Sequence, residues 1–289
     1  MSAIRDWTIE GSDGQPIFGN VHLPADADAA TGVLVCCHGF KGYKDYGFFP
    51  QLAQAAAEAG LIAHRFNFSH SGMTNRIETF ERPDLFERDT WGRQMHDLRA
   101  VMRAIRGGEL AGADRPVVWF GHSRGGVTCA VTAGQVFEQS VQTEQPAGVI
   151  LAAAPSSAMR LDESQREALR RLGRLPSPSS RTGQTLYVGV ESLDEYEAAP
   201  QRFDPLAAAA RITCPLLVIH GENDNTVPVT CAEDFRRTQP SATVEVIGGA
   251  SHTFNAPNPL PLDADPPGET AKLIERCVAF ANECVGKAR

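Results

Sequence analysis

The sequence predicts an α/β fold, with a mostly parallel sheet covered by helices on both faces. Apolar runs rich in β-branched residues alternate along the chain with segments whose apolar residues recur at helical spacing. One such run, residues 117–120, passes directly into Gly-His-Ser-Arg-Gly, which is typical of a strand, a very tight turn and a helix. The length of 289 residues suits one large domain, or one domain with an insertion.

The first half of the chain starts with a predicted hairpin, whose strands are residues 7–10 and 17–23. Two buried strands and an intervening helix that Gly60 ends follow it. A polar, irregular loop comes next, then a helix that ends at Gly107, and then a strand, a helix and a strand. These segments are 31–37, 49–59, 61–68, 69–90, 91–105, 117–120, 127–136 and 148–154.

The alternation of strands and helices stops between residues 156 and 203. Such a stretch is long for a connection, so it predicts a cap inserted into a core formed by residues 1–155 and 204–289. Within the cap, 161–172 predicts a helix and 175–180 a Pro/Ser-rich break. Asp204 and Pro205 then suit a helix start. Strands at 216–220 and 244–247 with a short helix between them, and a helix over 273–281, complete the chain.

Composition and charge exclude several classes of protein. A net charge of −8 and a pI of about 5.5 argue against a nucleic-acid binder and against a protein of anionic membrane surfaces. The sequence has no basic start followed by an apolar run, so we expect no signal peptide, no membrane segment and a cytoplasmic location. Its seven cysteines include no C-x-x-C pair, so we expect no structural zinc.

The Gly121-His-Ser123-Arg-Gly125 turn is the strongest chemical signal. Its glycines allow a turn at which the serine hydroxyl is forced outward above a helix N-terminus. The alternative is a glycine-rich loop with an inert serine. Asp224 and His252 also follow predicted strands, in the order Ser…Asp…His, and could activate Ser123 as a nucleophile. Glu222 competes with Asp224, but the D-x-x-V-P spacing favours Asp224.

A serine nucleophile also needs two hydrogen-bond donors for the developing oxyanion. The backbone N–H of Arg124, directly after the serine, is the first candidate, and that of Phe40, in the loop after the 31–37 strand, is the second. His122 and His220 are predicted to pack rather than react. Aromatic residues are candidates for a substrate pocket, in the cap and near the Phe40 loop: Tyr43, Tyr46, Tyr187 and Tyr196.

Four motifs together resemble the α/β-hydrolase fold serine hydrolases: HGF, GHSRGG, HGENDNTVP and GGASHTF. The resemblance covers nearly the whole chain outside the cap. It implies an eight-stranded sheet, no cofactor and an acyl-enzyme on Ser123. The size and position of the cap and the RFNFSHSG segment are similar to esterases of the cinnamoyl/feruloyl type.

The resulting hypothesis is a carboxylic-ester hydrolase with a Ser123–His252–Asp224 triad. It acts on a small-molecule ester, without cofactor or metal, as a monomer or homodimer. A peptidase, thioesterase or acyltransferase would use the same triad, because the fold does not select among them. A non-catalytic ligand-binding protein on this fold is the alternative from a different class.

Overall fold

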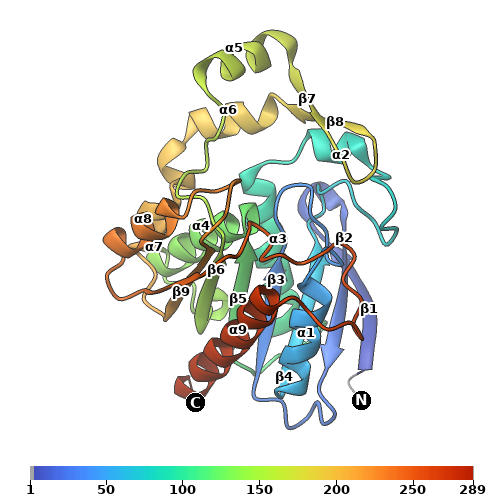
Figure 1. Ribbon diagram of the computed structural model, residues 1–289, viewed down its shortest axis with the longest axis vertical. Helices are drawn as coiled ribbons and strands as arrows, with labels where there is room; N and C mark the ends of the chain where they lie inside the picture. The colour runs from blue at the N-terminus through green and yellow to red at the C-terminus, as the bar shows by residue number, and fades with distance from the viewer. Residues whose placement is uncertain (1–2, 289) are drawn as a thin grey trace.

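The computed structural model describes residues 3–288, which form one large sheet with helices on both sides (Figure 1). Within these residues the sheet has eight strands, in the order β1-β2-β4-β3-β5-β6-β9-β10. β2 pairs antiparallel with β1 and β4, and all other neighbours are parallel. The predicted fold class is therefore confirmed. The strands are β1 Ala3–Glu10, β2 Pro16–Leu23, β3 Gly32–Cys37, β4 Leu61–Asn67, β5 Val117–His122, β6 Gly148–Ala152, β9 Leu216–Gly221 and β10 Thr243–Ile247.

Helices cover both faces of the sheet because its central strands are apolar on both sides. In β5, Val117 and Trp119 belong to the hydrophobic core of one face, and Val118 and Phe120 to that of the other. Two helices pack on one face, α1 Phe49–Glu58 and α9 Gly268–Lys287. Four pack on the other, α3 Trp91–Arg106, α4 Arg124–Glu138, α7 Pro205–Ala209 and α8 Thr230–Thr238.

The carboxyl ends of β3, β5, β6, β9 and β10 meet at one edge of the sheet, since these strands are parallel. The segment between β6 and α7 lies above this edge (Figure 1). We call residues 156–203 of this segment the cap. It contains α5 Glu163–Leu172, β7 Arg174–Pro178, β8 Thr185–Gly189 and α6 Glu191–Ala198, and ends in a 3-10 turn over Pro200–Phe203.

Two segments predicted as irregular contain regular structure. The Pro/Ser-rich stretch predicted as a break is β7, which pairs antiparallel with β8. Proline is tolerated there because a two-stranded sheet has only edge strands, which leave one row of N–H groups unpaired. The long polar loop after β4 contains a short helix, α2 Pro83–Glu87. Its proline occupies the first helical position, where the missing N–H costs no hydrogen bond.

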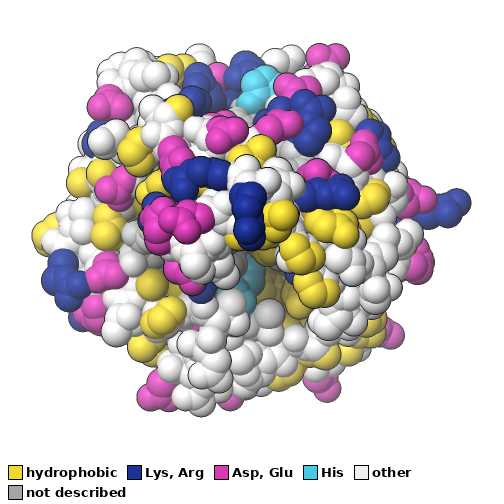
Figure 2. Space-filling view, turned by 90° about the horizontal axis from the view of Figure 1, so that it is seen from above, with side chains coloured by type: hydrophobic (Ala, Val, Ile, Leu, Met, Phe, Trp, Pro, Cys, Tyr) yellow, Lys and Arg dark blue, Asp and Glu magenta, His cyan; other side chains and the backbone are white. Residues whose placement is uncertain are grey.

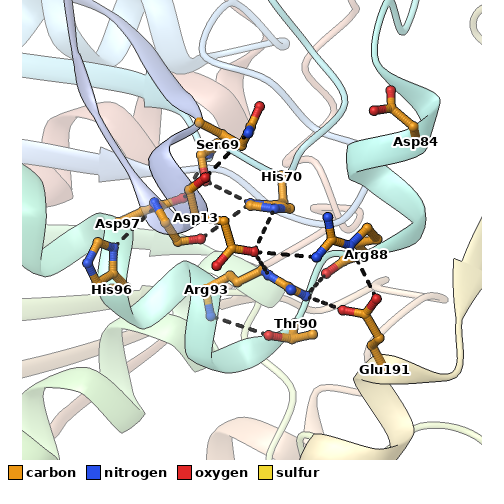
Figure 3. Close-up of polar contacts among 12 residues, drawn as sticks. Asp13, Ser69, His70, Asp84, Arg88, Thr90, Arg93, His96, Asp97 and Glu191 are labelled. Atoms are coloured by element: carbon orange, nitrogen blue, oxygen red, sulfur yellow. Dashed lines mark hydrogen bonds and ion pairs between the residues drawn. The ribbon is translucent and has the colours of Figure 1, made fainter.

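A network of charged side chains connects the cap to the core (Figure 3). Glu191, on α6, forms ion pairs with Arg93 on α3 at 2.7 Å and with Arg88 at 3.2 Å. Arg93 also pairs with Asp13, in the turn after β1, at 2.9 Å. One helical turn further along α6, Glu195 accepts a 3.0 Å hydrogen bond from the backbone N–H of Gly92 at the start of α3. The cap helix α6 is therefore held over the N-terminus of α3.

Four buried histidines make the stability of the fold sensitive to acid. Burial lowers the pKa of His22, His38 and His64 to about 4, and that of His122 to about 3. In the unfolded chain each has a pKa near about 6.5, so below that pH the unfolded state binds protons that the folded state does not. We expect the free energy of unfolding to change little between pH 7 and 8 and to fall between pH 6.5 and 4, by about 1.4 kcal/mol per pH unit for each net proton.

Urea unfolding at pH 7, 6 and 5 measures this slope. Burial raises the pKa of Asp89 to about 6, so below that pH its carboxyl binds a proton in the folded state. This proton offsets the one that one of the four histidines binds only in the unfolded state. His64→Gln removes one of the histidines with a lowered pKa. We expect the number of protons taken up on unfolding, which sets the slope, to fall by about one, whatever the effect of the substitution on the free energy of unfolding at pH 7. An unchanged slope in this variant would contradict the explanation.

Candidate active site

The connection from β5 to α4 is a single residue, Ser123, with φ 54° and ψ −121°. A positive φ is strained for serine, and the Ser123 N–H is held by a 2.8 Å hydrogen bond to the carbonyl oxygen of Ala152. A Cβ at Gly121 would lie 2.3 Å from the Gly125 oxygen, and one at Gly125 would lie 2.3 Å from the Cys37 oxygen. Only glycine therefore lets α4 start so close to β3 and β5.

Three side chains from three different strand ends form a chain of hydrogen bonds. His252, in the loop after β10, has its Nε2 3.0 Å from Ser123 Oγ. Its Nδ1 lies 2.7 Å from Oδ2 of Asp224, in the loop after β9. A carboxylate can only accept, so Nδ1 carries the hydrogen and Nε2 is free to accept the serine proton. The structure thus brings together the three side chains that the sequence singles out.

The Asp224 carboxylate is buried and held by several donors. Burial raises its pKa, but hydrogen bonds from His220, from His252 and from the Val227 N–H outweigh this and hold the pKa well below its usual value. Its Oδ1 accepts from the backbone N–H groups of Thr226 and Val227, both at 2.8 Å. His220 Nε2 lies 3.3 Å from Oδ2. The carboxylate is ionised and cannot rotate away from His252.

The competing acid, Glu222, lies elsewhere in the same loop. Its Oε2 accepts a 3.0 Å hydrogen bond from the N–H of Gly249, in the loop after β10. That bond connects the loops after β9 and β10. Glu222 therefore supports the loop that carries His252, while Asp224 touches the imidazole itself.

His122 supports the histidine loop from beneath. Its Nε2 donates to the backbone carbonyl of His252 at 2.8 Å, and the two ring centroids lie 4.9 Å apart. Burial lowers the pKa of His122 to about 3, so this ring is neutral and can only donate through one nitrogen. Both His122 and His220 are packed as predicted, and the structure adds that each contacts a member of the chain of hydrogen bonds.

The loop after β3 lies directly against Ser123. A Cβ on Gly39 would be 3.0 Å from the Ser123 Cβ, and the Gly42 N–H donates to the Gly39 carbonyl at 3.0 Å. His38 holds the loop: its Nε2 accepts from the Phe68 N–H at 3.2 Å, so its Nδ1 is the donor to the Gly39 oxygen at 2.8 Å. Phe40 follows Gly39, and Arg124 is the first residue of α4, next to the nucleophile candidate.

The Arg124 side chain packs near Phe40 and against two residues that the sequence did not single out, Trp91 and Asp89. Its guanidinium carbon lies 4.2 Å from the centre of the Trp91 ring and 5.8 Å from that of Phe40. One of its nitrogens lies 3.2 Å from the buried Asp89 carboxylate. Asp89 and Trp91 are more than thirty residues from Arg124, so only the packing of α3 against α4 reveals this cluster.

Two cavities meet at Ser123 and His252. One, of about 470 Å³, extends beneath the cap and is mostly apolar. Its apolar lining residues are Phe40, Trp91, Pro155, Ala158, Met159, Leu161, Val188 and Leu193. The other, of about 540 Å³, lies between the loop after β3 and the β7–β8 turn, and includes Lys41, Tyr46, Ser179, Ser180 and Arg181. We call them the apolar and the basic cavity.

The four tyrosines proposed for a substrate pocket have different positions. Tyr46 lines the basic cavity. Tyr43 is buried in a cluster with Met73, Phe80, Phe86 and Leu186. Tyr187 lies under the Arg174 guanidinium, 4.2 Å from its ring centre, and Tyr196 packs near Trp91 and Phe203. Within the described residues, Tyr46 is the one of the four that lines a cavity at Ser123.

Residues 3–288 contain no cluster of three or more His, Cys, Asp or Glu side chains suited to a metal ion. In the same part of the chain, no helix combines the length and apolar character needed to cross a membrane.

The order of the sheet and the strained turn between β5 and α4 define the class of α/β hydrolases. The chain belongs to the alpha/beta hydrolase family, whose family model matches residues 34–273. The protein is therefore a hydrolase. A comparison with curated protein sequences finds no match.

Solved structures share the fold at low sequence identity. Est1E from Butyrivibrio proteoclasticus, with ferulic acid bound, has a TM-score of 0.71 at 15% identity over 97% of this chain and 99% of its own. A putative hydrolase from Agrobacterium vitis S4 has a TM-score of 0.71 at 17% identity, with the same coverage. The esterase domain of a Rhodothermus marinus protein has a TM-score of 0.65 at 19% identity, covering 98% and 99%.

Proposed function

We propose that the protein is a serine esterase, with Ser123 as nucleophile, His252 as general base and Asp224 as the residue that orients His252. One observation carries the proposal: the continuous hydrogen bonding from Ser123 Oγ to His252 Nε2 at 3.0 Å and from His252 Nδ1 to Asp224 at 2.7 Å. A serine hydroxyl becomes an effective nucleophile when a positioned base takes its proton.

In the first half of the reaction, His252 Nε2 takes the proton of Ser123 as Oγ forms a bond to the acyl carbon. The backbone N–H groups of Phe40 and Arg124 would stabilise the oxyanion, and Arg124 adds the positive end of α4. When the bond to the leaving oxygen breaks, His252 returns the proton to that oxygen and the alcohol departs. The acyl group remains on Ser123.

In the second half, a water molecule donates its proton to His252 Nε2 and its oxygen attacks the acyl carbon. Collapse of the tetrahedral intermediate breaks the bond to Oγ, and the proton moves from His252 to Ser123. The ionised Asp224 stabilises the imidazolium that forms in both halves.

A small-molecule substrate is favoured over a long peptide by the surroundings of Ser123. The apolar cavity offers space for an apolar substituent, and its volume suits a small molecule rather than a folded chain. Among the proteins with this fold, Est1E is described with bound ferulic acid, and the Rhodothermus marinus protein has an esterase domain. A carboxylic ester of small-molecule size is therefore the proposed substrate.

Labelling with a fluorophosphonate tests the proposal, because this reagent phosphonylates activated serines. We expect a single adduct on Ser123, found by mass spectrometry of the peptide, together with hydrolysis of nitrophenyl esters. Prior heating should abolish the adduct, since an unfolded chain has no activated serine. Folded protein without an adduct on Ser123 would overturn the serine-esterase proposal.

A further inference from the structure

Two basic side chains in the lining of the basic cavity have no acidic partner. Lys41, in the loop after β3, and Arg181, in the turn between β7 and β8, both line the basic cavity. Within the described residues, neither takes part in an ion pair with a carboxylate. The whole chain carries a net charge of −8, and three of the seven cap arginines, Arg166, Arg170 and Arg174, pair with glutamates.

Their present contacts are with neutral groups. Lys41 Nζ donates to the Pro178 carbonyl oxygen at 2.6 Å, which leaves two of its three donors for another acceptor. Arg181 lies over the ring of Tyr43, with 4.6 Å from the guanidinium carbon to the ring centre, and over Phe80 at 5.0 Å. These contacts fix the directions of both side chains without neutralising either charge.

The lining of the basic cavity contains no Asp or Glu among the described residues. Burial lowers the pKa of Lys41, and no carboxylate counteracts it. A partly buried cation without a counter-charge is costly, and an anion from a ligand removes that cost through charge-assisted hydrogen bonds. Figure 2, a view from above the cap, shows a hollow near the centre of this face with basic and apolar side chains around it.

We propose that the substrates are esters that join an apolar group, bound in the apolar cavity, to a group that carries a carboxylate, bound in the basic cavity by Lys41 and Arg181. The two cavities share Phe40, Ser123, Thr226 and His252. An ester bond at Ser123 therefore has one substituent in each. This inference rests on the proposed esterase function and specifies its substrate class.

Two pairs of chromogenic esters test it, with the charge on opposite sides of the ester bond. The first pair is the nitrophenyl monoester of succinic acid and its neutral methyl ester. The second is the butyrate ester of a carboxynitrophenol and its neutral methyl ester. In one of the pairs we expect kcat/KM for the anionic member to exceed that for the neutral member by about tenfold, the effect of a charged hydrogen bond. That pair also identifies which side of the ester enters the basic cavity.

The ratio of the two kcat/KM values is the readout in the variants. Lys41→Met with Arg181→Met should bring the ratio of the favoured pair to about one, and Arg181→Met alone should reduce it. Arg171→Met with Lys272→Met removes the same total charge from exposed positions on α5 and α9, and should keep the ratio. A ratio near one in the unmodified protein for both pairs, or a ratio that survives both cavity substitutions, would overturn the inference.

The failure of this inference is distinguishable from failure of the esterase function. If the substrate class is wrong, the neutral esters are still hydrolysed and their hydrolysis still depends on Ser123. If the esterase function is wrong, no ester of either pair is hydrolysed, or the hydrolysis persists without the Ser123 hydroxyl.

Discussion

Ser123→Ala is expected to lower kcat/KM for nitrophenyl esters by about 10⁴-fold or more, because the variant has no nucleophile and retains only substrate binding and the oxyanion donors. Alanine meets the same backbone strain as serine at φ 54°, and its Cβ occupies the same space. We therefore expect the melting temperature to change by a few degrees at most.

Steady-state hydrolysis and thermal unfolding, measured on the same preparation, check this prediction. Fluorophosphonate labelling of Ser123→Ala should also be absent. A folded variant that keeps a tenth of the activity would show that another residue is the nucleophile.

Asp224→Asn is expected to lower kcat/KM by about 10³ to 10⁴-fold, through the wrong tautomer of His252. The position of the asparagine amide follows from the structure. Because the N–H groups of Thr226 and Val227 both donate to Oδ1, the asparagine oxygen must take that place. Its NH₂ group then faces His252 Nδ1, which has to become an acceptor. The hydrogen moves to Nε2, and that nitrogen can no longer take the proton of Ser123.

Glu222→Gln is the matched control, since Glu222 is the other acid of the same loop. A glutamine oxygen can still accept the hydrogen bond from the Gly249 N–H, so we expect kcat/KM within a few-fold of the unmodified protein. Measurement of both variants against one ester is decisive. A larger loss in Glu222→Gln than in Asp224→Asn would assign the orienting role to Glu222.

The sheet was predictable because its strands are buried on both faces and therefore appear as unbroken apolar runs, such as that of β5. The three strand-end residues Ser123, Asp224 and His252 were predictable as a group for a related reason. Parallel strands bring the loops at their carboxyl ends to one edge of the sheet, however far apart those loops are in sequence.

The cap and the cavities were less predictable, because their geometry depends on the direction of single side chains. Tyr187 and Val188 are neighbours on β8, where successive side chains point to opposite faces. Val188 lines the apolar cavity, so Tyr187 points the other way, to Arg174. The aromatic character of Tyr187 in the sequence does not indicate on which face it lies. Lys41 and Arg181 are likewise brought together only by the fold of the cap over the core.

The division of the active-site region between core and cap affects how the specificity of this protein can evolve. The described hydrogen bonds that orient Ser123, Asp224 and His252 all come from core residues, whereas Met159, Leu161, Val188, Leu193 and Arg181 of the cavity walls belong to residues 156–203. Mutations in the cap can therefore alter which molecules are admitted while the reacting groups keep their geometry. New substrate specificities can therefore arise by mutation or replacement of one continuous stretch of sequence. Substrate selectivity and the reactivity of the Ser123 region can then evolve separately.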